Sequence, residues 1–345
     1  MRRSPSDGRS HRRTAGRSVL LAAVLSVSPT IRLAGQVDAG QVQNSGALFL
    51  LFPVGAQVVG MGQTAGALDG RGEAAFGNPA GLATLPMGEF ALHSANLAAA
   101  TTSALTVFFP SRRIGVLGGA VYLVDYGDED VNDSTGTTIA RVAPRNLEVL
   151  AAYATELTAT FAVGITYKLV EFRVDCSGDC RQVPGRVGVT HALDIGGQFT
   201  VGPRGALRVG IAVRNVGFQL QVNNHGEADP LPARVVLGAI YSVNFRPLAG
   251  GGGDRFDVRF AADVDSPWGQ VGSPQMRVGV DVGYQRLVRV RGGYAFSGSG
   301  AGLSGPSVGL GITSGAIGVD LARPFLQGSG LVTPNPTFIS FRVAF

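Results

Sequence analysis

The chain has little of what enzymes and nucleic-acid-binding proteins usually carry. Only 15% of its 345 residues are charged, and it has two cysteines and a single tryptophan. Its four histidines, at positions 11, 93, 191 and 225, show no metal-ligand spacing. The net charge of +5 includes an arginine-rich leader, so no nucleic-acid partner is indicated. After residue 35 there is no apolar run of about 18 residues, which excludes a transmembrane helix.

Glycine, by contrast, is abundant. The chain has 51 glycines, about twice the usual share of roughly 7%. They follow no collagen-like period and lie inside apolar alternations and at turns. Two glycine-rich runs, residues 60–62 and 309–311, lack the spacing and the strand-to-helix context of a dinucleotide-binding loop. No cofactor is therefore predicted.

Residues 1–35 resemble a secretory signal peptide. They combine a basic beginning, an apolar stretch from Val19 to Val27, and small residues at Ala34 and Gly35. The alternative is a disordered basic tail with a chance apolar run. The cleavage position stays open because the residues before Ala34 fit the small-residue rule poorly.

Two cysteines, Cys176 and Cys180, lie in one short polar segment. An exported chain meets an oxidising compartment, so the pair could form a disulfide that pins a loop. A metal site is the alternative, but two thiols without a nearby histidine supply only half of a zinc ligand shell. We predict no metal site.

From residue 87 onward the sequence alternates with a period of two. In residues 160–170, bulky apolar side chains such as Val163 share one face, and small or polar side chains share the other. Residues 207–214 and 256–265 show the same split, with charges on one face only. A soluble β-sandwich would carry many Lys, Glu and Thr on its polar face, whereas this face carries Gly, Ala, Arg and Asp. The pattern favours an all-β fold, a transmembrane antiparallel β-barrel with a crowded interior and a lipid-facing exterior.

Turn residues divide residues 87–345 into about fourteen strands joined alternately by long and short connections. The predicted strands are residues 88–96, 102–110, 114–126, 145–155, 159–174, 188–202, 204–217, 232–246, 254–265, 276–285, 287–297, 304–313, 314–322 and 336–345. The longer connections, predicted to be external, are residues 127–144, 175–187, 218–231, 266–275 and 323–335.

The last strand ends on an aromatic residue. Phe341, Val343 and Phe345 share one face of it, an arrangement that resembles the C-terminal assembly signal of bacterial outer-membrane barrels. The alternative is the final strand of any β domain. We therefore predict export through the signal peptide to the outer membrane of a Gram-negative-type bacterium, with outer-membrane lipid as a partner.

Residues 36–86 precede the predicted barrel, and residues 46–86 do not alternate. Short helices and turns fit them better than strands. The motif residues Gly60, Gly62, Asn78, Pro79 and Gly81 lie here. An apolar, glycine-rich segment before a barrel could sit in the lumen as a hatch. A periplasmic cap is the alternative.

At these motifs the chain resembles the PorV/PorQ-type barrels of the larger FadL-like group. The resemblance rests on residues 55–62 (GAQVVGMG) and 76–82 (FGNPAGL). Residues 193–196, 207–217, 230–238 and 291–294 add further matches, in the family's order. The chain departs from the family at Gln63 and Thr64 and lacks an Asp-Asp pair before the second motif, which weakens the subfamily placement more than the fold.

Charged side chains on the polar face are predicted to lie in the lumen. They either neutralise one another across strands or mark a substrate path. They are Arg208, Arg214, Asp257, Arg259, Asp263, Asp281, Arg289 and Arg291. A second set, in a predicted external loop, could hold calcium or simply be solvated, and its spacing lacks the EF-hand order. It comprises Asp125, Asp128, Glu129, Asp130 and Asp133.

Three function classes follow, none of them enzymatic, although serine and histidine side chains could still meet in space at a barrel rim. The PorV/PorQ resemblance implies a role in protein export and surface delivery by type IX secretion, with exported cargo and secretion-system subunits as partners. The wider FadL-like group implies uptake of a hydrophobic ligand past a hatch. A structural barrel without transport is the third class.

Overall fold

The computed structural model describes residue 1 and residues 46–345, apart from the gaps given at the end of this paragraph. The chain divides into two units, residues 1–38 and 39–345, and the second unit is described below. The predicted signal peptide, its cleavage site and residues 36–45 of the predicted hatch lie outside the described residues. The gaps are residues 98, 182–184, 203–205, 222–227, 246–255, 269–273, 286, 298–303 and 326–335.

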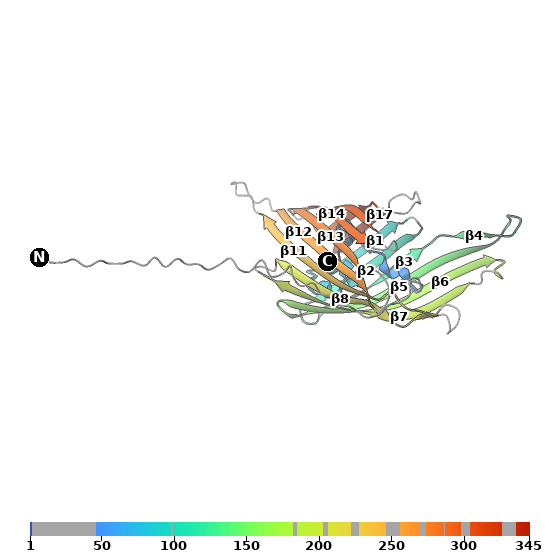
Figure 1. Ribbon diagram of the computed structural model, residues 1–345, viewed down its shortest axis with the longest axis horizontal. Helices are drawn as coiled ribbons and strands as arrows, with labels where there is room; N and C mark the ends of the chain where they lie inside the picture. The colour runs from blue at the N-terminus through green and yellow to red at the C-terminus, as the bar shows by residue number, and fades with distance from the viewer. Residues whose placement is uncertain are drawn as a thin grey trace. The chain divides into compact units, whose positions relative to one another are not determined.

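Fourteen long antiparallel strands form a closed barrel (Figure 1). Each strand pairs with the next along the chain, β8 pairs with β11, and β1 closes the ring against β17. The strands are β1 (Glu89–Asn96), β2 (Thr101–Ser111), β3 (Gly115–Asp125), β5 (Thr138–Thr158), β6 (Phe161–Gly178), β7 (Arg186–Val201), β8 (Leu207–Gly217), β11 (Arg234–Phe245), β12 (Phe256–Pro267), β13 (Gln275–Tyr284), β14 (Val288–Ser297), β15 (Gly305–Ser314), β16 (Ile317–Pro324) and β17 (Thr337–Ala344).

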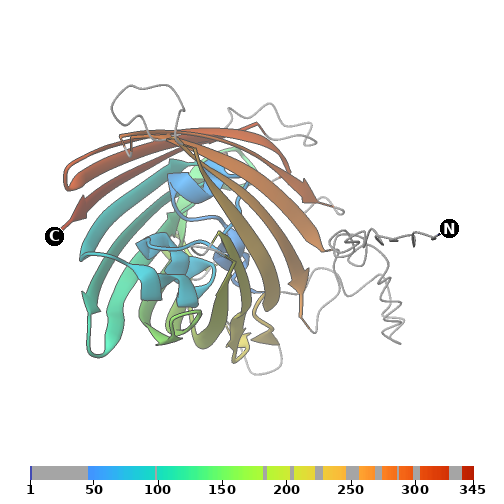
Figure 2. The same ribbon diagram turned by 90° about the vertical axis from the view of Figure 1, so that its left-hand side faces the viewer.

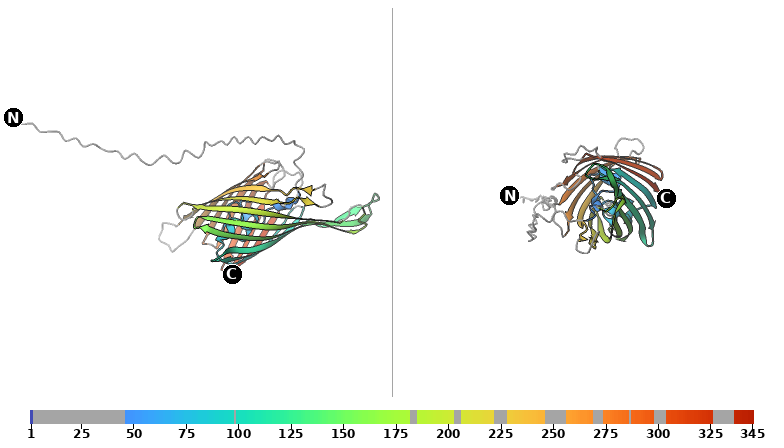
Figure 3. Two further views of the ribbon diagram at one scale, coloured as in Figure 1. Left: turned by 90° about the horizontal axis from the view of Figure 1, so that it is seen from below. Right: turned by 90° about the vertical axis from the view of Figure 1, so that its right-hand side faces the viewer.

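These fourteen strands confirm the predicted fold class, with three corrections to its external connections. Residues 127–144 are not a loop, because β4 (Glu129–Asn132) pairs with an extension of β5. Strand β6 likewise runs into the predicted loop 175–187, so the β5–β6 hairpin reaches past its neighbours (Figure 3). The predicted strand began at residue 145, but β5 starts at Thr138 because β4 pairs with this part of it on one side and β6 on the other. In 218–231 a small pair forms, β9 (Leu220–Gln221) with β10 (Ala228–Asp229).

Side chains alternate between the outside and the inside of the barrel as predicted. Val209 and Ile211 are 42% and 47% exposed, whereas Ala212 between β7 and β11 is 1% exposed. Most exposed large side chains of the strands are apolar. Such a surface is stable against lipid and unfavourable in water, and ring closure leaves no unpaired strand edge in the wall.

The described residues before the barrel, 46–88, form four short helical pieces inside the ring of strands (Figure 2). We call residues 46–86 the inner segment. No described helix is long and apolar enough to cross a membrane. The α-helix packs against β14–β17, and the last 3-10 helix packs against β5, β6 and β7. The pieces are η2 (Leu48–Leu51), α1 (Ala56–Gly60), η3 (Gly72–Phe76) and η4 (Pro79–Thr84).

Candidate functional site

The candidate site is the lumen, where glycines of the wall meet glycines of the inner segment. A Cβ atom at Gly210 of β8 would lie 2.0 Å from the carbonyl oxygen of Gly66. A Cβ atom at Gly293 of β14 would lie 2.2 Å from the backbone nitrogen of Gly62, and Gly309 of β15 touches Gly60 in the same way. Backbone can approach backbone this closely only where both side chains are hydrogen. The excess of glycine on the polar face therefore accommodates the inner segment.

The Asn-Pro-Ala-Gly motif ties the inner segment together and to the wall. Asn78 caps η4, with its Oδ1 accepting a hydrogen bond from the backbone N–H of Ala80. Its Nδ2 donates to the carbonyls of Gly66 (2.7 Å) and Gly197 (3.2 Å). Pro79 occupies the first helical position, where its missing N–H has no consequence. A Cβ atom at Gly81 would lie 2.0 Å from the Leu68 carbonyl oxygen. The motif thus has a structural role in seating the segment.

Ion pairs hold a second part of the inner segment. Asp69 forms salt bridges with Arg208 of β8 and Arg259 of β12. Burial alone would raise the pKa of Asp69, but these two guanidinium groups hold it below its usual value. Asp263 of β12 accepts hydrogen bonds from the backbone N–H groups of Ala65 and Gly66, at 2.6 and 2.8 Å.

The structure places all eight predicted lumen charges on the inner face of the barrel. Arg289 pairs with Asp257 and Asp281, and Arg291 pairs with Asp281 and Asp320. Asp281 lies on the neighbouring strand β13, whereas Asp257 and Asp320 lie two strands away, on β12 and β16. Arg208, Arg259 and Asp263 instead bind the inner segment. Arg214 forms no ion pair among the described residues and donates to the Leu50 carbonyl at 3.4 Å.

Several buried polar residues were not singled out from the sequence. Lys168 of β6 contacts Asp194 of β7 at 2.8 Å and Glu148 of β5 at 3.4 Å, and it donates to Asn215 of β8. Those on the strands lay on the polar face of an alternating stretch, which was the available signal, whereas the partly buried Asp69 and the buried Glu73 lie in the inner segment, which does not alternate. Their positions along the strands did not show which of them would meet. The others are Asp69, Glu73, Glu89, His93, Asp320 and Arg342.

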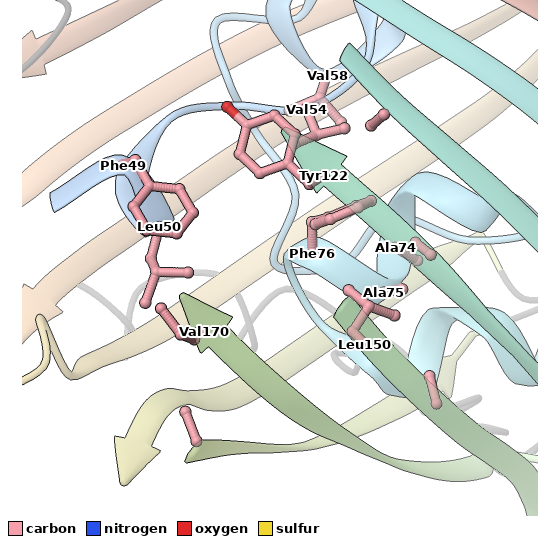
Figure 4. Packing of buried hydrophobic residues seen from close by; sticks show 14 of the residues in the cluster. Phe49, Leu50, Val54, Val58, Ala74, Ala75, Phe76, Tyr122, Leu150 and Val170 are labelled. Atoms are coloured by element: carbon pink, nitrogen blue, oxygen red, sulfur yellow. The ribbon is translucent and has the colours of Figure 1, made fainter. Parts of the chain in front are cut away.

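On the opposite side of the lumen, the inner segment makes apolar contacts. The Phe49 and Phe76 rings lie 6.2 and 6.1 Å from the Tyr122 ring of β3, and Leu50, Val54 and Val58 join the same cluster (Figure 4). The wall contributes buried side chains from β2, β3, β5 and β6. They include Phe108, Val116, Tyr122, Val124, Leu150 and Val170.

A cavity lies beside this cluster, between the inner segment and the wall. Its lining includes Phe52, Val54 and Phe76 from the segment and Arg214 and Arg277 from the strands. Its volume is about 30 Å³, room for about two water molecules. Ligand pockets usually measure about 300–1,000 Å³, so a passing molecule would have to displace part of the segment.

A serine and a histidine do meet in space, but not as a hydrolytic triad. Ser340 Oγ lies 2.8 Å from His93 Nδ1, and Glu73 Oε1 lies 3.6 Å from the same nitrogen. A triad needs the serine and the acid on different ring nitrogens. Residues 305–309 (GPSVG) also match the Gly-x-Ser-x-Gly pattern, but Ser307 lies within β15 and not at a strand-to-helix turn.

The predicted acidic loop and the cysteine pair lie where β4, β5 and β6 pair with one another beyond the neighbouring strands. Cys176 and Cys180 form a disulfide at the end of β6. The acidic residues near Asp130 are partly neutralised by arginine, since Asp130 lies 3.0 Å from Arg141. The described residues include no group of three or more His, Cys, Asp or Glu side chains arranged to hold a metal ion.

The C-terminal residues belong to the closing strand. Phe341 lies on the outer face of β17, which pairs with β1 and β16, and Val343 is half-buried on the same face. The Phe345 ring packs edge-on against Phe109, with the ring centres 5.6 Å apart, and its N–H donates to the Gly88 carbonyl. The role of these residues in assembly stays a prediction.

Comparison with known proteins bears on the fold. No protein-family model and no curated protein matches the chain. Among solved structures, the Ralstonia pickettii toluene transporter TbuX matches at 14% identity and a TM-score of 0.56, over 84% of this chain and 98% of that chain. The P. putida toluene transporter TodX matches at 12% identity and a TM-score of 0.57, over 84% of this chain and 98% of that chain. The CymD monoaromatic hydrocarbon channel matches at 16% and 0.55, over 85% and 97%. The chain therefore has the fold of these three barrels, a closed antiparallel barrel of fourteen strands.

Proposed function

We propose that the protein is a non-enzymatic channel for the uptake of small hydrophobic molecules across the outer membrane. The observation that carries the proposal is the apolar contact between the inner segment and strands β2, β3, β5 and β6. The interior of an outer-membrane barrel is usually polar. An apolar inner wall, covered by a short segment, offers a hydrophobic molecule a surface that a water-filled pore lacks. The likeness to hydrocarbon transporters in fold supports the same reading.

In this proposal residues 36–86 act as a hatch. The described part, residues 46–86, lies in the lumen, and two cavities of about 10 and 30 Å³ lie beside it. Helices of four to six residues have few internal hydrogen bonds, so their stability depends on packing against the wall. Such a segment can be displaced locally without unfolding the barrel.

The narrower reading as a PorV/PorQ-type export barrel gains no support from the comparisons. It predicts that the protein, solubilised from its own cells, carries exported proteins that share one C-terminal domain, or secretion-system subunits. Co-purified hydrocarbon or lipid without protein partners favours the uptake channel. The pull-down therefore separates the two functions.

Uptake of a radiolabelled alkylbenzene by cells with and without the protein tests the channel directly. We expect faster uptake with the protein, and at least severalfold slower uptake for Val170→Asp, because the new carboxylate would lie beside an apolar path and directly opposite the buried Glu148 of β5. Val170 is fully buried on the inner face of β6. The matched control is Val170→Thr, which has nearly the same shape and should retain uptake. Equal uptake with and without the protein would refute the proposal.

A further inference from the structure

Glu73 of the inner segment is buried without a cation of its own. Its side chain is 4% exposed, and its Oε2 atom has no hydrogen-bond partner. A Cβ atom at Gly55 would lie 2.3 Å from the Glu73 carboxyl carbon, and Gly55 has a φ of +94°, which favours glycine. The backbone of the inner segment therefore closes directly over this carboxyl group.

The nearest histidine cannot supply a positive charge. Ser340 Oγ accepts a hydrogen bond from the Ala56 N–H at 2.9 Å, so its own hydrogen is free to point at His93 Nδ1, 2.8 Å away. A charged imidazolium would carry N–H groups on both ring nitrogens, and His93 Nε2 is buried without a hydrogen-bond partner among the described residues. His93 therefore faces Glu73 as an uncharged ring.

The charged groups around Glu73 are already paired. Arg71, the residue before the η3 helix that contains Glu73, lies 3.7 Å from Glu89 of β1. On the wall, Arg342 of β17 and Arg291 of β14 each lie 2.5 Å from Asp320 of β16. Burial, followed by repulsion from Asp320, raises the pKa of Glu73 to about 8.

We propose that Glu73 is a proton-sensitive switch for the hatch: the inner segment stays seated while the Glu73 carboxyl is protonated and is released when that carboxyl ionises. This inference rests on the proposed uptake channel and adds its regulation. An ionised Glu73 would be a buried charge without a partner under Gly55, and exposure to water removes that penalty. The switch joins the segment to β1 and β17, the strands that close the barrel.

The direction of the pH effect follows from proton binding. While the inner segment is seated, the Glu73 carboxyl keeps its proton up to a pH of about 8. In the released state we assign it the ordinary pKa of 4.5. The released state therefore becomes more favourable as the pH rises from 4.5 to about 8. Below a pH of about 6.5 an exposed His93 would gain a proton that the seated state refuses, which offsets the effect. Between about pH 6.5 and 8 the seated state binds one proton more than the released state. Over this range the ratio of released to seated protein should therefore rise roughly thirtyfold.

Thiol labelling of the full-length protein in outer-membrane vesicles tests the switch without any ligand. The reporter is Val54→Cys, since Val54 of the inner segment is buried and the two natural cysteines are disulfide-bonded. Maleimide labelling rates are compared between the Glu73 and Glu73→Gln backgrounds at each pH. Their ratio cancels the pH dependence of the thiol itself. Glu148→Gln is the matched control, because Glu148 is equally buried but has Lys168 as its partner.

We expect the rate ratio to rise about thirtyfold between pH 6.5 and 8, and Glu148→Gln to rise as the parent does. A flat ratio, or an equal rise in Glu73→Gln, would overturn the switch. Heat-modifiable gel migration checks that each variant is folded. A flat ratio with normal alkylbenzene uptake overturns the switch alone, whereas a pH-dependent ratio without any uptake overturns the proposed function alone.

Discussion

Replacing Gly210 with alanine should unseat the inner segment and leave the barrel intact. The new methyl group would lie 2.0 Å from the Gly66 carbonyl oxygen and 2.8 Å from Asn78 Nδ2. Both are backbone or tightly held atoms, so the segment must move. Overpacking of this kind costs about 1–3 kcal/mol. Loss of the 2.7 Å hydrogen bond between Asn78 and Gly66 adds about 1 kcal/mol. The free energy that holds the inner segment in the lumen should fall by roughly 2–4 kcal/mol, which raises the ratio of displaced to seated segment about 30- to 1,000-fold.

The assay is the labelling rate of an Ala67→Cys reporter, because Ala67 is buried beside the affected contact. Gly292→Ala is the matched control, since a Cβ atom there meets nothing within 4 Å. Heat-modifiable migration should be unchanged in both variants, as Gly210 keeps its strand partners. If Gly210→Ala labels no faster than Gly292→Ala, the inner segment does not depend on glycine contacts and the reasoning fails.

Four further changes probe other parts of the molecule. Val209→Arg should destabilise the barrel by about 2–4 kcal/mol in refolding titrations into vesicles, because Val209 faces lipid. Asp263→Ala leaves two buried N–H groups without acceptors, so the Ala67→Cys reporter should label at least tenfold faster. Deletion of Phe345 should lower the folded fraction in outer membranes, and normal assembly would contradict a terminal recognition role. Reduction of the Cys176–Cys180 disulfide should leave the thermal midpoint of the barrel unchanged, because the bond closes only a short external loop.

The barrel could be predicted from the sequence because its pattern is local. Successive residues of a strand face lipid and lumen in turn, so the residues directly before and after Val209 show which side it faces. The prediction was wrong at β5, because residues 127–144 were assigned to a connection. There the strand continues because β4 and β6 pair with it outside the barrel.

The filling of the lumen could not be predicted in the same way. The alternation suggested that Arg208 and Arg259 each pair with a carboxylate on another strand. The two arginines lie on β8 and β12, which β11 separates. The carboxylate that joins them is Asp69, well over a hundred residues away along the chain in a segment without any period. The short 3-10 helices around Asp69 carry no repeating pattern, so their sequence does not show which wall residues they contact.

The two sides of the inner segment should respond differently to a passing molecule. On the side of β8 and β12, Asp69 sits between two arginines, and no apolar molecule can replace that carboxylate. On the side of β3, Phe49 packs against Tyr122, and a hydrophobic molecule that separates them restores the apolar contact that it breaks. Displacement is therefore least unfavourable beside β2, β3, β5 and β6. We expect substitutions such as Val170→Asp on that wall to slow uptake, and Asp263→Ala on the other side to change seating more than passage.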